Sequence, residues 1–341
     1  MPDQPRLIPK AWVSYDQVTP AINDSENVTS VTDTSTGLFT VFWATDFVDT
    51  TYNMVTGGCD DGNDRGVTVS EDSTGSTRLA GSCVYESRDT SSNPALRDQS
   101  FNAILAFGDL SSAPSVDHPA LMCRGWVHYD HVTPTINDSE NVASVTDSAA
   151  GEFIVNWDID FSDSAYAAVS GCNDGNETGT SNYVVHEDNS ARAVGATTFR
   201  AGRVRNSATY TDLDEVSVAA VGAVATGSPW NMPRLIAKAW VNYDQVSATP
   251  VVEDSENVAS VTDNGLGDFT LNWDTDFGSA NYAAVMQVSN EDLPDANAYN
   301  IQEIGTGAAH LAASLQCSTS RQHNTTTRVD ARSGVMAFGD Q

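Results

Sequence analysis

The stretch AWVSYDQV at 11–18, followed by DSENVTSVTD at 24–33, decides the fold, because the chain contains both of them three times. The opening stretch returns as GWVHYDHV at 125–132 and as AWVNYDQV at 239–246. The second stretch returns as DSENVASVTD at 138–147 and again at 254–263. Such regular self-similarity indicates one structural unit repeated in tandem.

The repeat divides the 341 residues into three units joined by short linkers. The units also end alike, with ILAFGD at 104–109, SVAAVG at 217–222 and VMAFGD at 335–340. We assign residues 1–109, 120–222 and 234–341 to the units, and 110–119 and 223–233 to Pro-, Ser- and Gly-containing linkers. A unit of about 100 residues buries a usable core. A linker of ~10 residues reaches roughly 30 Å when extended, which permits either a row or a ring of units.

The repeated segments read as β-strands. In LFTVFWA at 38–44, the apolar residues Phe39, Val41 and Trp43 recur with the period of two that marks a strand. AWVSYD alternates as well, with Trp12 on the face opposite to Ala11, Val13 and Tyr15. A glycine follows each VTD segment as a tight hairpin requires, and these glycines are Gly37, Gly151 and Gly267. The sequence has no helical stripe of useful length, so each unit is predicted to be an antiparallel, jelly-roll-like β-sandwich of seven to nine strands.

The charge of the chain is strongly one-sided. Its 46 acidic residues oppose 16 basic ones, for a formal net charge of -30. Lys10 and Lys238 are the only lysines. Such repulsion destabilises a compact chain in dilute salt, but the Debye length falls to about 3 Å at 1 M salt. We therefore expect a halophilic source. The charge also argues against nucleic acid as a partner, because no basic stripe faces the phosphates.

Two further features bear on location. The sequence contains no apolar run of about 18 residues and no leader after MPDQPR, so we expect neither membrane insertion nor secretion by a cleaved signal. Release by lysis together with a virus particle is one remaining route to the outside.

The copies diverge unevenly. They match closely from the opening tryptophan to a tyrosine that follows the second tryptophan, and then drift apart until the last strand; these tyrosines are Tyr52, Tyr166 and Tyr282. Because recognition usually resides in loops carried on a rigid scaffold, we expect the later halves to bind partners. We expect the shared halves to pack against one another.

The pattern AWVxYD…DSENVxSVTDxxxGxFxVxWxxDFxxxxY…AFGD resembles a domain widespread in the structural proteins of tailed viruses, chiefly tail fibres and receptor-binding fibres. The resemblance covers the front half and the last strand of all three copies, roughly half the chain. It implies a virion-surface scaffold that trimerises about a fibre axis, and it identifies no active residue. This chain departs from that pattern by its three tandem copies and by the lack of a coiled-coil or β-helical shaft.

The resemblance and the composition together imply a surface protein of a halophilic tailed virus, assembled in the host cytoplasm and exposed on the particle. Its expected partners are other virion proteins and a host cell-surface glycoprotein or glycan. Three copies per chain favour an intrachain pseudo-trimer, and the competing arrangement is a rod of beads that forms a homo-oligomer side by side. The alternative function is a capsid decoration, turret or head-fibre protein at a threefold or quasi-threefold site.

Two acidic, Gly-containing segments are candidates for a cation such as Ca²⁺, which takes six to eight oxygen ligands. They are GCDDGNDRG at 58–66 and GCNDGNETG at 171–179, and the third copy has no counterpart. The candidate ligands are Asp60, Asp61, Asn63, Asp64, Asn173, Asp174, Asn176 and Glu177. The alternative is a solvated acidic turn. We expect no other cofactor.

The DSEN segments allow two interpretations. Their acidic residues could face one another in a ring between copies, or they could bond to their own backbone and shape a turn; these residues are Asp24, Glu26, Asp138, Glu140, Asp254 and Glu256. The six repeated tryptophans are predicted to form the scaffold between domains, namely Trp12, Trp43, Trp126, Trp157, Trp240 and Trp273.

Catalytic signals are weak. His128 and His131 flank a YD pair in the second copy alone, so we expect neither a metal-binding nor a catalytic role for them. The sequence contains no GxSxG, HExxH or P-loop motif. Paired carboxylates for glycoside cleavage are available in so acidic a chain. A function spread over three similar copies nevertheless favours a protein that is not an enzyme.

Overall fold

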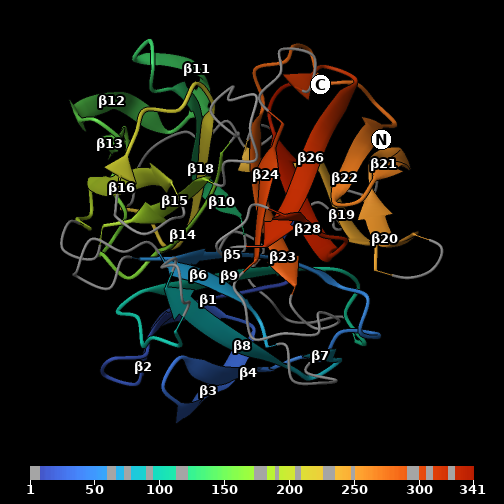
Figure 1. Cartoon of the computed structure of the whole chain (residues 1–341). Coiled ribbons are helices and arrows are strands. Elements are labelled where there is room, and N and C mark those ends of the chain that lie inside the picture. The colour runs from blue at the N-terminus through green and yellow to red at the C-terminus, as the bar shows by residue number, and fades with distance from the viewer. Residues whose placement is uncertain are drawn as a thin grey trace.

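In the computed structural model, every unit consists of two antiparallel sheets facing each other, as expected for an all-β chain. Residues 8–59, 67–72, 78–89, 95–112, 122–172, 183–188, 192–203, 209–225, 235–246, 250–289, 299–304, 310–321 and 327–341 are described. Figure 1 shows the three sandwiches in blue, green and orange to red, gathered around a common centre. In this described part of the chain, no helix has the length and hydrophobicity needed to cross a membrane.

The eight longer strands of each unit follow one another in the same order. Unit 1 comprises β1 (Ala11–Asp16), β2 (Ala21–Glu26), β3 (Val28–Ser35), β4 (Leu38–Trp43), β5 (Asn53–Gly58), β6 (Val67–Glu71), β7 (Arg78–Leu79), β8 (Ser82–Asp89) and β9 (Asn102–Phe107). Unit 2 comprises β10 (Cys123–Asp130), β11 (Thr135–Glu140), β12 (Val142–Ala149), β13 (Glu152–Trp157), β14 (Ala167–Cys172), β15 (Tyr183–Glu187), β16 (Ala196–Arg203), β17 (Thr209–Tyr210) and β18 (Val216–Val221). Unit 3 comprises β19 (Ala239–Asp244), β20 (Val251–Glu256), β21 (Val258–Gly265), β22 (Asp268–Trp273), β23 (Ala283–Ser289), β24 (Tyr299–Glu303), β25 (His310–Leu311), β26 (Ser314–Arg321), β27 (Thr327–Arg328) and β28 (Arg332–Phe338).

Each unit has an inner sheet of four strands and an outer sheet. The inner sheets have the orders β2-β1-β9-β5, β11-β10-β18-β14 and β20-β19-β28-β23. The outer sheets are built on β3-β4-β8-β6, β12-β13-β16-β15 and β21-β22-β26-β24, and the short strands β7, β17, β25 and β27 are added to them. The later halves of the units, which diverge in sequence, thus contribute equivalent strands to both sheets.

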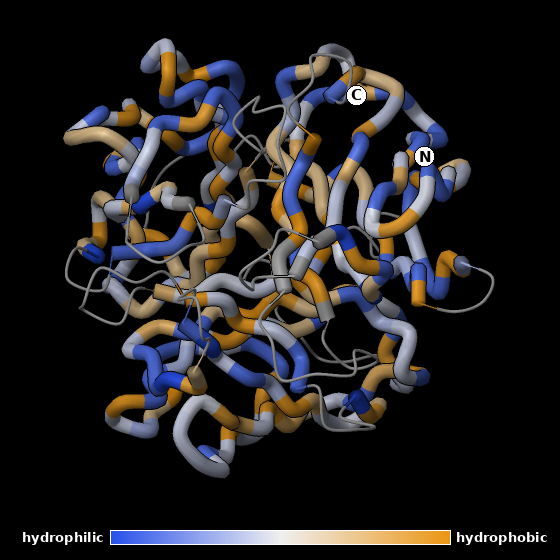
Figure 2. Tube along the Cα trace, in the orientation of Figure 1, coloured by the Kyte–Doolittle hydropathy of each residue, from blue (hydrophilic) through white to orange (hydrophobic). Residues whose placement is uncertain are grey.

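The period of two in the sequence explains the core of each sandwich. Phe39, Val41 and Trp43 on β4 are buried in the core of unit 1. The indole N–H of Trp43 donates a hydrogen bond to the Tyr52 hydroxyl over 3.3 Å, and Phe47 stacks on the Tyr52 ring. The same tryptophan–tyrosine bond recurs in units 2 and 3. In Figure 2 the strands change repeatedly between hydrophobic and hydrophilic residues along their length.

The asparagine at the end of DSEN lies at the turn between the second and third strands of each unit, where the chain passes from the inner to the outer sheet. Asn27 adopts a φ of 55°, a left-handed conformation that asparagine tolerates better than most residues. Its side-chain oxygen accepts a hydrogen bond from Thr45 N at 2.8 Å, which ties the turn to the segment after β4. The same conformation recurs at Asn141 and Asn257. This local role accounts for the threefold repetition of the segment.

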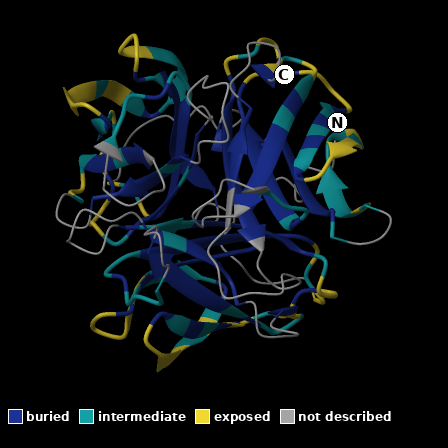
Figure 3. Cartoon of the chain, viewed as in Figure 1, coloured by how far each residue is buried: buried dark blue, intermediate teal, exposed yellow. Residues whose placement is uncertain are grey.

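The opening strand of each unit is buried on both faces. On β1, Ala11, Val13 and Tyr15 pack into the core of unit 1, whereas Trp12 points into a central cluster shared by all three units. Trp126 and Trp240 belong to the same central cluster. Figure 3 shows buried residues running through the strands that meet at the centre, and exposed residues at the peripheral hairpins. The three units therefore form a ring around one core, rather than a row.

Candidate functional site at the joints between units

The inner sheets of the units pack against one another cyclically. The closing strands β9, β18 and β28 contact β14, β23 and β5 of the neighbouring unit, respectively. We call the contacts of unit 1 with unit 2, unit 2 with unit 3 and unit 3 with unit 1 the first, second and third joints. Each joint repeats the same pair of strands, so the arrangement has pseudo-threefold symmetry.

Glycines allow the backbones at the joints to approach closely. A Cβ atom on Gly57 would lie 2.2 Å from the carbonyl oxygen of Ala168, and one on Gly171 would lie 2.4 Å from that of Ala284. At the third joint the glycine comes from the closing strand, where a Cβ on Gly334 would lie 2.3 Å from the Met54 oxygen. Real Cβ atoms do not occur at such distances, so these positions require glycine.

Polar bonds also cross the joints. At the second joint, Ser217 Oγ accepts a hydrogen bond of 3.0 Å from Ala284 N, and Tyr183 N donates to Gln302 Oε1 over 3.1 Å. At the third joint, Asn242 Nδ2 donates to Thr51 O over 2.9 Å.

Four structurally equivalent positions meet at every joint, and their chemistry differs. Two of these positions belong to the outer sheet and are aligned by their register with the long strand β8, β16 or β26. The position just before that strand is occupied by Arg78, Arg192 or His310. The position on the strand paired with it is occupied by Glu71, Glu187 or Glu303. The neighbouring unit supplies Phe101, Glu215 or Arg332 at the closing strand, and Ser14, His128 or Asn242 on the opening strand. The three joints thus have the same geometry but carry different residues at the equivalent positions.

The first joint contains a fixed cation. Arg192 Nε donates to Glu187 Oε1 over 2.6 Å, and the two side chains are only 2% and 3% exposed. The Arg192 guanidinium lies 4.3 Å from the centroid of the Phe101 ring of unit 1. This cation–π contact joins the two units, because the ion pair belongs to unit 2 and the ring to unit 1.

The third joint adds a second ion pair. Arg78 Nε donates to Glu71 Oε1 over 2.6 Å, and Arg78 Nη1 donates to the Tyr52 carbonyl over 2.9 Å. On the side of unit 3, Arg332 Nη2 donates to Glu253 Oε1 over 2.9 Å. Burial raises the pKa of Glu253, while Arg332 and Arg78 act to lower it.

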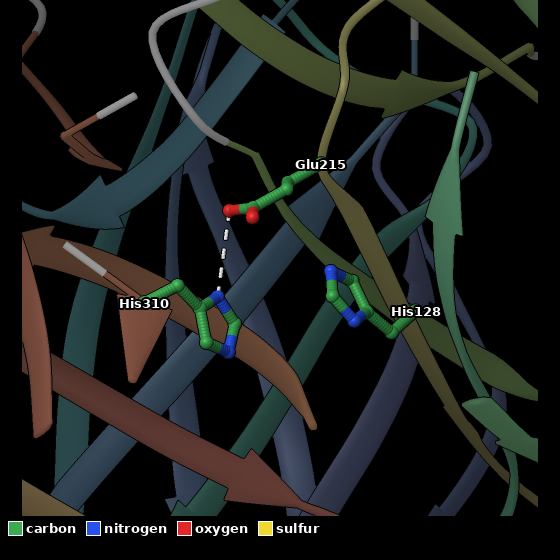
Figure 4. Close-up of side chains that lie close together, drawn as sticks. All are labelled: His128, Glu215 and His310. Carbon is green, nitrogen blue, oxygen red and sulfur yellow. Dashed lines mark ion pairs between the residues drawn. The ribbon is translucent and has the colours of Figure 1, made fainter. Parts of the chain in front are cut away.

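The second joint replaces the arginine with a histidine. His310 Nδ1 lies 2.7 Å from Glu303 Oε2 of its own unit and 3.4 Å from Glu215 Oε2 of unit 2. The His128 ring of unit 2 stacks on the His310 ring, with centroids 5.2 Å apart. Figure 4 shows Glu215 and His128 converging on His310 from the neighbouring unit. One ligand atom from each of these three residues lies within 4.8 Å of the others.

His128 is buried without a polar partner. His128 is 2% exposed, and neither of its ring nitrogens has a hydrogen-bond partner among the described residues. Burial lowers the pKa of His128 to about 4, so the imidazole is neutral at neutral pH.

The other three groups of the second joint are strongly coupled. Burial disfavours the charged form of His310, but Glu303 and Glu215 outweigh it and raise the His310 pKa to about 10. Burial raises the pKa of Glu303 to about 7, although His310 lies beside it. Burial acts in the same direction on Glu215, yet its contacts with His310 lower the Glu215 pKa to about 2. A cationic His310 between carboxylates therefore closes the joint at neutral pH.

A hollow lies where the three units meet beyond the central cluster. It is lined by residues of β5, β6, β14, β15, β23 and β24 and leaves about 50 Å³ of internal space. A few water molecules fit there, whereas small-molecule sites occupy about 300–1,000 Å³. The hollow as described is too small for an organic ligand.

Only three of the six tryptophans that we predicted at the contacts between domains lie there. Trp12, Trp126 and Trp240 do lie in the central cluster, where Trp126 stacks on Phe338 of unit 3 with ring centroids 6.5 Å apart. The other three, Trp43, Trp157 and Trp273, lie in the core of their own unit. Strand alternation is the reason, because β4, β13 and β22 belong to the outer sheets, which direct their apolar face inward.

The acidic DSEN residues follow the local interpretation. Asp24 Oδ1 accepts a hydrogen bond of 2.9 Å from the adjacent Ser25 N, and Asp138 and Asp254 make the same bond with Ser139 and Ser255. Strands β2, β11 and β20 lie at the sheet edge opposite to β5, β14 and β23, and on each of them the aspartate of DSEN bonds to the backbone of the residue that follows it.

The expected division between shared and divergent halves needs correction. The shared hairpins of β3, β12 and β21 are largely exposed, whereas β5, β14 and β23 from the divergent halves lie at the joints. The hairpins carry Asp, Ser and Thr residues that favour water, and the joint strands carry small apolar ones. The candidate cation ligands Asp60, Asp61, Asn63, Asp64, Asn173, Asp174, Asn176 and Glu177 lie outside the described residues.

Sequence reasoning missed Glu215 and His310. A signal existed in the divergent halves: TRLAGS at 77–82 aligns with AHLAAS at 309–314, and a glutamate stands seven residues before Arg78 and seven residues before His310. That alignment places a histidine where the first copy has arginine. Comparisons with family models, curated proteins and solved structures found no match to this chain.

Proposed function

We propose that this chain is a non-enzymatic surface protein of a halophilic tailed-virus particle, of the fibre or receptor-binding type, and that it attaches the particle to a host cell. In this proposal one polypeptide supplies the threefold knob that separate chains form in the fibres it resembles. The observation that carries the proposal is the cyclic packing of three sandwiches around one core.

The positions of the divergent segments support a recognition role. Segments 60–66 and 173–182 resemble each other, whereas 290–298 differs from both, and all three lie outside the described residues. The strand ends that flank them line the hollow between the units, with Gly58 and Val67 in unit 1, and Cys172 and Val184 in unit 2. These described strand ends, from different units, therefore lie at one hollow. Weak contacts from several knobs on one particle would add through effective concentration.

Cell attachment tests the proposal. We would label the full chain and measure its binding to haloarchaeal cells before and after enzymatic removal of surface glycans. Replacing 60–66 and 173–182 by Gly-Ser segments of equal length should abolish binding without changing the melting temperature. The matched control replaces exposed residues of the β3 hairpin, such as Thr32, and should bind normally. Equal binding by the segment variants would contradict the proposed binding face.

The halophilic part of the proposal has its own test. Dialysis from multimolar to about 0.1 M salt should unfold the chain, because the repulsion of a net charge of -30 is then less screened. Near-UV circular dichroism follows the loss of packing around the buried tryptophans. An unchanged spectrum at low salt would contradict a halophilic origin.

A capsid decoration, turret or head-fibre role is the second candidate. A chain with its own pseudo-threefold symmetry fits a threefold or quasi-threefold position on a capsid, which favours this role. A density map of the particle distinguishes the two roles: density at the tail tip supports attachment, and density over capsomer centres or junctions supports decoration. Incubation with host surface glycans tests separately for an enzyme, whose action would shorten them.

A further inference from the structure

We propose that His128, Glu215 and His310 form a binding site for one divalent transition-metal ion, with Zn²⁺ as the best match, which links units 2 and 3. The inference rests on the second joint alone and does not depend on the function proposed above.

The geometry brings the donors close to the separation that a metal needs. One ligand atom from each residue lies within 4.8 Å of the other two. A tetrahedral Zn²⁺ ion with bonds of about 2.0–2.2 Å places its ligand atoms roughly 3.3 Å apart. Side-chain rotations that move each ligand atom by about 1 Å would therefore bring the three atoms to this spacing. The backbones are held by the strands that carry them, because His128 lies in β10 and His310 in β25.

The donor set suits zinc. Imidazole and carboxylate are common zinc ligands, and a ligating histidine must be neutral. His128 meets that condition, being buried with both ring nitrogens unpartnered among the described residues. Nε2 of His310 also lacks a hydrogen-bond partner there. Glu303, at 2.7 Å from His310 Nδ1, is placed to orient that ring, as carboxylates commonly do for metal-bound histidines.

The other two joints show what the metal would replace. Arg78 and Arg192 supply the positive charge opposite Glu71 and Glu187 at the third and first joints. The second joint keeps the buried glutamate as Glu303 and adds Glu215, but has a histidine in place of the arginine. A bound Zn²⁺ would supply this positive charge in place of one proton of His310, which is released to solvent, and it would use the two imidazoles that meet at this joint.

Zinc titration of the full chain tests the inference. We would strip the protein with a chelator, hold it in high salt with excess Ca²⁺ to saturate oxygen-only sites, and add Zn²⁺ while measuring bound metal and heat. We expect one Zn²⁺ per chain and a higher melting temperature. H128S and H310R, which install the residues of Ser14 and Arg78, should each weaken zinc binding at least tenfold. E303Q should weaken it about 10–100-fold, as loss of a carboxylate behind a ligand does.

The control variant is H131Q, which installs the residue of Gln17 and Gln245 and should bind zinc like the wild type. Near-UV circular dichroism confirms that each variant is folded, and H128S still tests the site if H310R does not fold. Failure of the wild type to bind zinc would overturn the inference and leave only the His310 ion pair. Binding that survives in H128S with unchanged affinity would overturn it as well, because the ion would then lie elsewhere.

Discussion

The first and second joints are built from equivalent strands, yet one is closed by a permanent charge and the other by groups that exchange protons. Arg192 pairs with Glu187 and covers the Phe101 ring of the neighbouring unit. At the equivalent place, His310 lies between Glu303 and Glu215. The comparison teaches that the strand register determines which positions meet, while the residues at those positions remain free to change their chemistry.

The largest expected effect comes from removing the buried carboxylate at each joint. E187Q leaves Arg192 charged and buried, so we expect a loss of about 3–5 kcal/mol in the free energy of unfolding. E303Q should cost clearly less above pH 7, because His310 can release its proton whereas arginine cannot. Urea unfolding at constant salt measures both. Equal losses in the two variants would show that the joints do not differ in the way proposed.

Steric substitutions at the joints should have the next largest effect. G57A and G171A each place a methyl group against a backbone carbonyl of the neighbouring unit, and we expect each to cost about 3 kcal/mol. G278A is the matched control, since its Cβ would meet nothing closer than 3.6 Å. Thermal melting compares the three variants. A neutral G171A would mean that the second joint is looser than this geometry requires.

The pH dependence of stability should separate the joints further. In metal-free protein burial disfavours the charged form of His310, but Glu303 and Glu215 outweigh burial and raise the His310 pKa to about 10. A raised histidine pKa stabilises the fold fully below the unfolded value of about 6.5, and this contribution disappears as pH rises toward 10. We expect a loss on the order of 2 kcal/mol over that range.

The variant H310R keeps its charge throughout that range and should abolish this part of the profile. Melting temperatures from pH 6.5 to 10 in a chelating buffer test the expectation. A profile in H310R as steep as that of the wild type would assign the pH dependence to other groups.

The smallest expected effect concerns the ring at the first joint. F101L removes the cation–π partner of Arg192 but keeps an apolar side chain, so we expect a loss of about 1 kcal/mol. F42L, at a phenylalanine that is 39% exposed and faces no cation in the described contacts, is the control. A loss no greater in F101L than in F42L would remove the cation–π contact from the description of the first joint.

Most of the β-structure could be predicted from local patterns. Alternation placed Phe39 and Val41 in the core of the sandwich and Trp12 on the opposite face of β1 from Val13. Gly37 has a φ of 68°, as a hairpin glycine should. These features depend on residues that are close in sequence, and the threefold repetition made them easy to recognise. The second tryptophan of each copy was misplaced because an aromatic residue in a strand suits a core and an interface equally well.

The joints could not be predicted in the same way. The divergent halves form equivalent strands, but this equivalence is visible in the backbone pairing and not in similar side chains. His128 looked like an isolated histidine in one copy. Its neighbours are Glu215, 87 positions later in the same unit, and His310 in the next unit.

By itself the sequence determined that this protein consists of three like units, that they are built of strands, and that they carry a large negative charge. Only the tertiary structure decided that the units close into a ring and that each joint combines four equivalent positions. The reason is that strand formation follows from alternation over a few residues, whereas the ring depends on packing between surfaces that are distant in the chain. The linkers permit either arrangement, and the apolar face of the opening strands, with Trp12, Trp126 and Trp240, favours the one that buries it.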